Sequence, residues 1–100
     1  MLFRSRYPAA AQWLADHGYA TTVEYLAAMC QLVVNEIGML PHANAGALYH
    51  DELAALRPWS ASQGMMLESV SERLCGPGGP HEHAPDKRPR TRLQMIRRAG

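Results

Sequence analysis

The chain has 100 residues, of which 47% are hydrophobic and 19% charged, which suits one globular domain and excludes a disordered chain. Its formal net charge of +1 provides no field that would draw the whole molecule to nucleic acid or to a membrane. Two cysteines, Cys30 and Cys75, are too few for a disulfide framework or a zinc ribbon, and we interpret them as buried thiols in a reducing cytosol.

Two helices are predicted in the N-terminal part of the chain. The first runs from Pro8 to Asp16 and is ended by Gly18, because glycine readily adopts the left-handed conformation of a helix C-terminus. The second covers residues 22–38, with a capping-box pattern at Thr21 and Gly38 at its end. Its apolar residues recur at the helical period and predict one buried stripe: Val23, Leu26, Met29, Cys30, Val33, Val34 and Ile37.

Strands and helices alternate in the remainder of the chain. We predict a strand over 39–43, a helix over 51–57, a strand over 60–67, a helical turn over 68–74, a loop over 76–86 and a helix over 89–99. In the last helix, Pro89 suits the first turn, and the residues expected to face the core are Leu93, Ile96 and Ala99.

This order predicts an α/β fold with parallel strands. A parallel sheet needs both faces covered, and a complete (β/α)₈ barrel takes about 200–250 residues. The pattern therefore favours a partial slice, about two βα units, of a larger (β/α) barrel over a complete domain of 100 residues.

Glu68 follows the apolar run 64–67 and is expected at the carboxyl end of the second strand, where barrel enzymes bind their ligands. An ionised carboxylate offers about four lone-pair sites, so it can accept hydrogen bonds from both hydroxyls of a ribose. The alternative is a solvated glutamate in the first turn of a helix, where a negative charge is favourable.

Three further residues are candidates for ligand binding. Arg92 could pair its guanidinium fork with a carboxylate, or lie exposed on an amphipathic helix. His42 and Asn44 follow the first strand and would face the same end of the sheet as Glu68, unless they bond to the loop backbone.

Two other patterns carry less weight. His81-Glu82-His83 brings together two imidazoles and a carboxylate, but it lies in a Gly/Pro loop without a third histidine at a characteristic spacing, so we predict no metal site. The basic run 87–92 could contact phosphates, but no aromatic residues are interleaved, and charged residues on the outer face of a helix explain it.

Four motifs together resemble one enzyme family. They are His42-Ala43-Asn44, the run SASQGMMLES over 60–69, Ser71-Glu72-Arg73-Leu74, and the pattern Pro-Asp-Lys-x-Pro-x-x-Arg-Leu from Pro85 to Leu93. The combination resembles the FO synthases, radical S-adenosylmethionine (SAM) enzymes that make the deazaflavin chromophore as a lyase subunit or as the matching half of a fused protein. The resemblance extends from about Trp13 to Gly100.

The resemblance implies residue roles. Glu68 would bind the ribose of SAM with Met66 and Ser69 beside the adenosine, and Arg92 would bind the SAM carboxylate. His42 and Asn44 would bind the substrate. The chain departs from the family pattern at Ala45, where a proline is usual, and at Glu82-His83, where an aromatic and a small residue are common.

The resemblance also implies a reaction. SAM would be cleaved reductively to a 5′-deoxyadenosyl radical, which abstracts hydrogen from an adduct of a tyrosine-derived hydroxybenzyl group and a ribitylaminouracil. Ring closure with loss of ammonia then gives FO.

This chemistry requires a 4Fe-4S cluster on a Cys-x3-Cys-x2-Cys loop, and the sequence contains no such loop. We therefore predict that residues 1–100 are a fragment of a single radical SAM barrel domain without its cluster-binding N-terminal part, inactive alone. Its partners would be the small-molecule substrate and the companion radical SAM half or subunit.

No apolar run at the N-terminus has the length of a signal peptide, and no segment approaches a membrane span, so a soluble cytoplasmic protein is predicted. One alternative function is a non-catalytic barrel remnant that binds a partner protein through the 23–37 helix. A nucleic-acid module using residues 87–98 is another.

Overall fold

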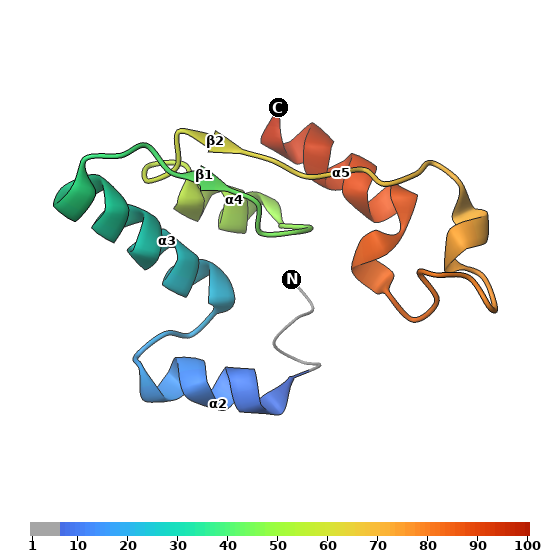
Figure 1. Ribbon diagram of the computed structural model, residues 1–100, viewed down its shortest axis with the longest axis horizontal. Helices are drawn as coiled ribbons and strands as arrows, with labels where there is room; N and C mark the ends of the chain where they lie inside the picture. Colours follow the sequence, from blue (N-terminus) through green and yellow to red (C-terminus); the bar gives the residue numbers. More distant parts are fainter. Residues whose placement is uncertain (1–6) are drawn as a thin grey trace.

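The computed structural model describes residues 7–100, which form four α-helices and two short strands joined by turns (Figure 1). The N-terminal segment for which no signal peptide is predicted includes residues 1–6, which lie outside the described residues. The first helix, α2 (Pro8–Asp16), has the predicted bounds, and Gly18 after it adopts a φ of 82°. A helix that ends with a left-handed glycine is what the local sequence specifies.

The second predicted helix is present as α3 (Thr22–Leu32), continued by a wider π-helical turn, η1 (Val33–Ile37). At its start the Thr21 hydroxyl accepts a hydrogen bond from the Glu24 amide at 3.1 Å, and the Glu24 carboxylate accepts one from the Ala20 amide at 2.7 Å. The predicted buried stripe is wrong at its end, because Ile37 is 65% exposed. The turn that carries Ile37 extends beyond α4, the helix against which α3 packs.

The two strands are parallel and much shorter than predicted. β1 (His42–Ala43) pairs with β2 (Ser62–Gln63), with His42 opposite Ser62 and Ala43 opposite Gln63. The predictions of strands over 39–43 and 60–67 are therefore wrong in length, and Met39 and Leu40 are exposed. Strand assignment depends on ladder hydrogen bonds, and within residues 7–100 each strand has only the other as a neighbour.

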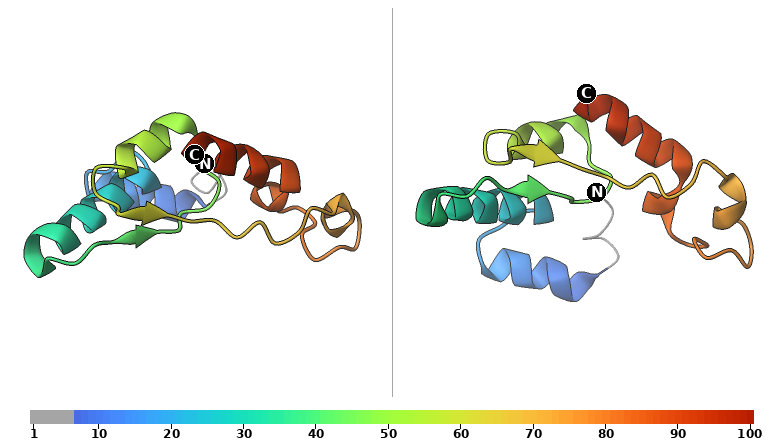
Figure 2. Two further views of the ribbon diagram at one scale, coloured as in Figure 1. Left: turned by 90° about the horizontal axis from the view of Figure 1, so that it is seen from above. Right: turned by 45° about the horizontal axis from the view of Figure 1, so that its top comes forward.

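Between the strands lies α4 (His50–Leu56), within one residue of the predicted 51–57. The Glu52 carboxylate accepts a hydrogen bond from the Tyr49 amide at 2.7 Å and so caps its first turn. Leu53 and Leu56 are buried on its inner face. The helix covers one face of the two-stranded sheet, while α3 and α5 (Pro89–Ala99) pack against α4 from either side (Figure 2).

The core lies on this covered face of the sheet. Its buried members are Val23, Ala43, Leu48, Leu53, Leu56 and Met95. Because successive strand residues point to opposite faces, Ala43 enters the core while His42 projects from the other face, where it is exposed. The uncovered face is therefore the one on which a polar site can be built.

The last helix has the predicted bounds but buries a different face. Pro89, Arg92 and Met95 are buried, whereas Leu93 is 38% and Ile96 is 43% exposed. The prediction that Leu93, Ile96 and Ala99 face the core is therefore wrong. A stripe defined by apolar residues alone could not include Arg92, whose guanidinium bonds to backbone carbonyls.

Between β2 and α5 the chain forms two short 3₁₀ turns, η2 (Glu72–Cys75) and η3 (Pro85–Lys87). The helical turn predicted over 68–74 thus begins four residues late, at Glu72, and Glu68 is not in a helix.

Among the described residues, no helix is long and apolar enough to cross a membrane. The α/β class is confirmed, whereas the larger barrel stays a prediction.

Candidate functional site

Glu68 occupies a left-handed backbone position five residues after the end of β2. Its φ is 69°, and the Ser69 amide donates a hydrogen bond to the Leu67 carbonyl at 2.9 Å. A bond that spans one central residue with positive φ defines a γ-turn of the rare, strained kind. Strain of this sort in a residue other than glycine persists only where surrounding contacts impose it, and it is concentrated at functional sites.

Two cations from the C-terminal part of the chain face the Glu68 carboxylate. Lys87 Nζ lies 2.9 Å from Glu68 Oε1, and Arg92 Nη1 lies 4.0 Å from the same oxygen. Lys87 ends η3 and Arg92 lies in the first turn of α5, so the turn after β2 is joined to two elements about 20 residues further along the chain. These three residues form the carboxylate cluster.

Arg92 is the buried member of the carboxylate cluster, with 7% of its surface exposed. Its Nε donates to the Asp86 carbonyl at 2.9 Å, and its Nη1 donates to the Met66 carbonyl. A buried guanidinium must be hydrogen-bonded, and these two carbonyls accept two of its five N–H groups. The alternative of an exposed Arg92 on an amphipathic helix is therefore wrong.

The Lys87 ammonium, through its hydrogen bond and its charge, lowers the pKa of Glu68 below its ordinary value. Partial burial opposes this shift, and the charges of Arg92 and His81 add to it. Glu68 is therefore ionised at neutral pH and acts only as a hydrogen-bond acceptor. Within residues 7–100 no group bonds to its second oxygen, Oε2, and this part of the chain leaves that oxygen available as an acceptor for a ligand.

Met66 and Ser69, the two residues predicted to lie beside the adenosine, differ in what they can offer a ligand. The Met66 side chain is 68% exposed and offers an apolar surface beside the carboxylate cluster. The Ser69 hydroxyl accepts a hydrogen bond from the Ser71 amide at 3.0 Å, which leaves its own proton for a further partner.

His42 and Asn44 form a separate group at β1. His42 Nδ1 is hydrogen-bonded to Ser62 Oγ at 2.7 Å, across the strand pair. The imidazole lies over Gly64, where a Cβ would come within 2.8 Å of Nε2, so glycine is required for this approach. Asn44 is exposed, and its side chain makes no hydrogen bond within the described part of the chain.

The structure does not bring the predicted residues into one site. Among residues 7–100, no hydrogen bond or ion pair joins His42 or Asn44 to the carboxylate cluster. The strands end too early for their carboxyl ends to place the two groups side by side, and Glu68 is carried away from β2 by an extended segment (Figure 1).

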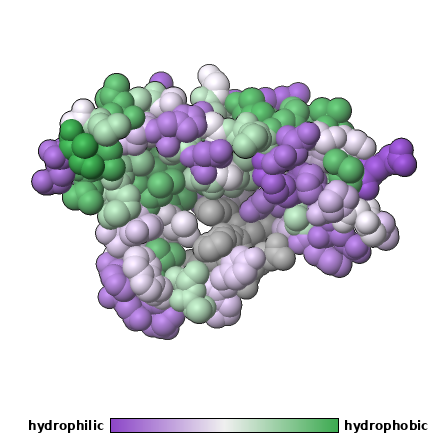
Figure 3. Space-filling model, viewed as in Figure 1, coloured by the Kyte–Doolittle hydropathy of each residue, from purple (hydrophilic) through white to green (hydrophobic). Residues whose placement is uncertain are grey.

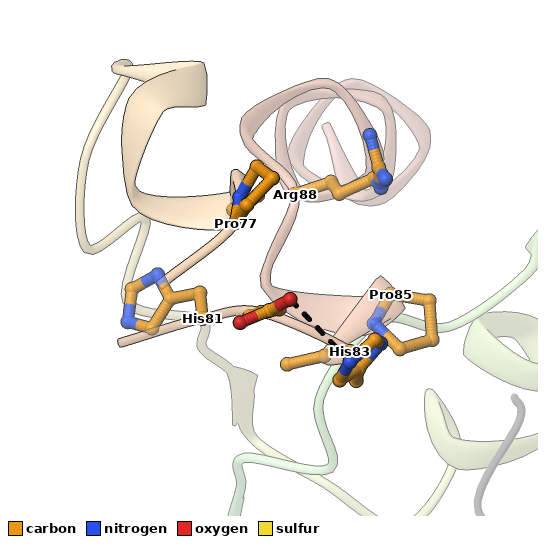
Figure 4. Close-up of a pocket in the computed structure, with 8 residues that line it drawn as sticks. Pro77, His81, His83, Pro85 and Arg88 are labelled. Atoms are coloured by element: carbon orange, nitrogen blue, oxygen red, sulfur yellow. Dashed lines mark ion pairs between the residues drawn. The ribbon is translucent and has the colours of Figure 1, made fainter. Parts of the chain in front are cut away.

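A pocket of about 280 Å³ lies in the loop between η2 and α5, lined by Cys75, Pro77, His81, Glu82, His83, Ala84, Pro85 and Arg88 (Figure 4). In it, Glu82 accepts a hydrogen bond from the Gly78 amide at 2.9 Å and lies 3.5 Å from His83 Nε2. The carboxylate therefore stabilises the glycine-rich loop itself. No group of three metal-ligating side chains is found among the described residues.

Lys87 is the member of the carboxylate cluster that the sequence alone does not identify. It lies in the Pro-Asp-Lys motif and at the start of the basic run 87–92. Its partner, Glu68, is 19 residues away, and no helical or strand spacing connects the two positions.

Comparison with known proteins gives close relatives. The chain is 52% identical over 95 residues to the 7,8-didemethyl-8-hydroxy-5-deazariboflavin synthase of Methanopyrus kandleri, covering 95% of this chain and 28% of the relative. It is 43% identical over 96 residues to the FO synthase of Streptomyces coelicolor and 40% identical over 97 residues to that of Mycobacterium tuberculosis, covering 11% of each. No protein-family model and no solved structure matches the chain.

The chain thus spans between about a tenth and about three tenths of the length of these relatives. Nearly all of its own length is included in each match, in agreement with a resemblance to one segment of these longer proteins. The resemblance to FO synthases inferred from the motifs is confirmed.

Proposed function

We propose that this chain, which is homologous to a segment of the FO synthases, forms part of an enzyme of deazaflavin cofactor biosynthesis. That enzyme would be a cytoplasmic radical SAM lyase with a (β/α) barrel. It would join a tyrosine-derived hydroxybenzyl group to a ribitylaminouracil with loss of ammonia. The relatives named as synthases support the enzyme class and the cofactor pathway.

The carboxylate cluster fits a SAM-binding role. A ribose presents two hydroxyl donors, and Glu68 presents a carboxylate that is held ionised with Oε2 free. The exposed Met66 side chain would contact the adenosine beside it, and the Ser69 hydroxyl would donate to it. SAM bound there would supply the radical that starts the reaction.

Arg92 has a second predicted ligand, the carboxylate of SAM. Its Nε and Nη1 are already bonded to backbone carbonyls, which leaves Nη2 for this contact. The guanidinium would thus bind the SAM carboxylate through Nη2 while its Nε and Nη1 hold the backbone on either side of the carboxylate cluster.

The residues of this chain do not fit the 4Fe-4S cluster. Cys30 is buried in α3, and the half-buried Cys75 thiol lies 3.9 Å from the Lys87 carbonyl oxygen. Two thiols in separate elements cannot supply the three cysteines of a radical SAM cluster. We assign no step of the cluster's chemistry to this chain.

His42 and Asn44 are proposed substrate ligands. The imidazole is exposed on the uncovered face of the sheet and is held by Ser62, so its orientation is set before a ligand binds. Asn44, which offers two donors and an acceptor, suits the polar edge of a uracil ring.

The observation that carries the proposal is an ionised carboxylate on a strained turn, held by two cations, in a chain homologous to FO synthases. The test is a chimera in which this chain replaces the matching segment of the Methanopyrus kandleri synthase. We expect the chimera to form FO, identified by chromatography and mass spectrometry. In the chimera, Glu68→Gln should raise the dissociation constant for SAM by about 10-fold or more, as loss of a charged hydrogen-bond acceptor does.

The matched control is Glu72→Gln, which removes an exposed carboxylate from the neighbouring turn η2. If the chimera does not fold, a smaller exchange of residues 60–93 alone takes its place. A folded, cluster-loaded chimera that forms no FO would contradict the proposed function.

A further inference from the structure

We propose that Lys87 is a positioning residue for Glu68. Its ammonium holds one carboxylate oxygen and thereby directs the other toward the hydroxyl groups of the ligand. This inference rests on the function proposed above and adds to it a residue to which neither the motifs nor the relatives assign a role.

The contacts of Glu68 are asymmetric. Lys87 Nζ bonds to Oε1 at 2.9 Å, and the nearer guanidinium nitrogen of Arg92 faces the same oxygen at 4.0 Å. Among the described residues no donor reaches Oε2. Both cations therefore contact the carboxylate through Oε1, and Oε2 has no hydrogen-bond donor among residues 7–100.

The backbone that carries Lys87 is itself held from two sides. Within η3 the Lys87 amide donates to the Ala84 carbonyl at 3.0 Å. From α5, the buried Arg92 donates through Nε to the carbonyl of the preceding residue, Asp86. The origin of the lysine side chain is therefore fixed, and only its own torsions remain free.

Glu68 needs such a partner because its side chain is otherwise poorly constrained. About a third of it is exposed (35%), and a glutamate side chain loses rotamer entropy when it is ordered. The positive φ of Glu68 fixes its backbone but does not choose the rotamer of its side chain. The ammonium makes that choice before the ligand arrives, which lowers the entropy cost of binding.

A direct contact between Lys87 and the ligand is the competing explanation, because 37% of the lysine side chain is exposed. The two explanations differ in whether the effects of changing Lys87 and Glu68 on ligand affinity depend on each other. A positioning residue acts only through Glu68, so its removal should have no further effect once Glu68 has been changed. A residue that contacts the ligand itself should have an independent effect.

The first experiment is a double-mutant cycle in the chimera described above, with the dissociation constant for SAM measured by calorimetry. We expect Lys87→Met to weaken binding by about 3- to 10-fold and Glu68→Gln by about 10-fold or more, as loss of a charged hydrogen bond does. The double variant should bind no more weakly than Glu68→Gln alone, and Lys87→Arg should restore part of the affinity.

The matched control is Arg90→Met, which removes one positive charge from the same basic run without touching a residue of the carboxylate cluster. It should leave SAM binding unchanged. Multiplicative effects of Lys87→Met and Glu68→Gln in the double variant would overturn the inference, as would an unchanged affinity in Lys87→Met.

The second experiment uses the unaltered 100-residue chain and needs no ligand. The Glu68 carboxyl carbon is followed by NMR as a function of pH, with Lys87, Arg92 and His81 as the charged groups that face it. Because Lys87 lowers the pKa of Glu68, Lys87→Met should raise it, whereas Arg90→Met should not. An unchanged titration in Lys87→Met would also overturn the inference.

The two experiments separate the inference from the function on which it rests. If Glu68→Gln leaves SAM binding unchanged, the proposed function fails, whatever the NMR titration shows. If Glu68→Gln weakens binding but Lys87→Met does not, the function stands and the positioning role fails.

Discussion

At the scale of single residues, the carboxylate cluster shows how a strained position is maintained. Glu68 has a positive φ that a residue with a side chain seldom adopts. Arg92 bonds to the Met66 carbonyl just before the turn, and Lys87 bonds to the carboxylate at its centre. Both the backbone and the side chain of the turn are therefore held by residues from the C-terminal part of the chain.

Gly64 provides a test at the same scale. In Gly64→Ala the new methyl group would lie 2.8 Å from His42 Nε2, so the exposed imidazole should turn away and break its bond to Ser62. We expect a change in the free energy of unfolding of no more than about 1 kcal/mol, because the lost hydrogen bond is offset by lower entropy of the unfolded chain.

The measurement is the ¹⁵N shift pattern of the His42 ring, together with urea denaturation. Ser62→Ala is the control that removes the same hydrogen bond without adding a methyl group. A Gly64→Ala variant whose His42 shifts match those of the parent would show that the ring does not lie over residue 64.

At the scale of elements, capping residues and glycines were sufficient to predict the ends of the longer helices, although not of the short turn over 68–74. The capping residues Thr21 and Glu24 and the left-handed Gly38 act within a few residues of the ends of their helix, so the sequence alone predicts where it begins and ends. The face that α5 buries was predicted incorrectly, because a buried arginine satisfied by carbonyls is invisible to an apolar pattern.

The buried face of α5 can be tested with two truncations. Met95 is 3% exposed and belongs to the core, so Met95→Ala should lower the free energy of unfolding by about 2–3 kcal/mol. Leu93→Ala, on the adjacent exposed face, should cost less than about 1 kcal/mol.

Urea denaturation of both variants, beside the parent chain, measures the two costs. An equal or larger loss for Leu93→Ala would restore the face predicted from the sequence. Helix content measured by circular dichroism before denaturation would confirm that both variants keep α5.

At the scale of the whole molecule, apolar side chains remain on the surface. In Figure 3 they gather over the end of α3, where Ile37, Met39 and Leu40 are exposed. One face of the sheet is uncovered by any described element, whereas parallel sheets are commonly buried on both faces. The relatives are several times longer than the matching segment, and the barrel that such length would permit stays a prediction.

Cluster chemistry provides a test at this scale. After anaerobic reconstitution with iron and sulfide, the purified 100-residue chain should show no stoichiometric iron and no visible iron–sulfur absorbance. Its two free thiols lie in separate elements, and one of them is buried in α3.

Iron analysis and absorbance spectroscopy provide the measurement, and the Cys30→Ser/Cys75→Ser variant gives the background of non-specific iron. A cluster bound in stoichiometric amount by the parent chain, and lost in the variant, would contradict the expectation.

The sequence alone determined the bounds of α2, α4 and α5 to within one residue, the α/β class, the resemblance to FO synthases and the choice of Glu68 as a candidate ligand, because each depends on neighbouring residues or on motifs. Only the tertiary structure decided the length of the strands, the buried face of α5 and the pairing of Glu68 with Lys87. These depend on contacts between residues 19 or more positions apart, such as Lys87 with Glu68 and His42 with Ser62. Ladder hydrogen bonds and ion pairs form only when the folded chain brings such positions together, and no local pattern encodes them.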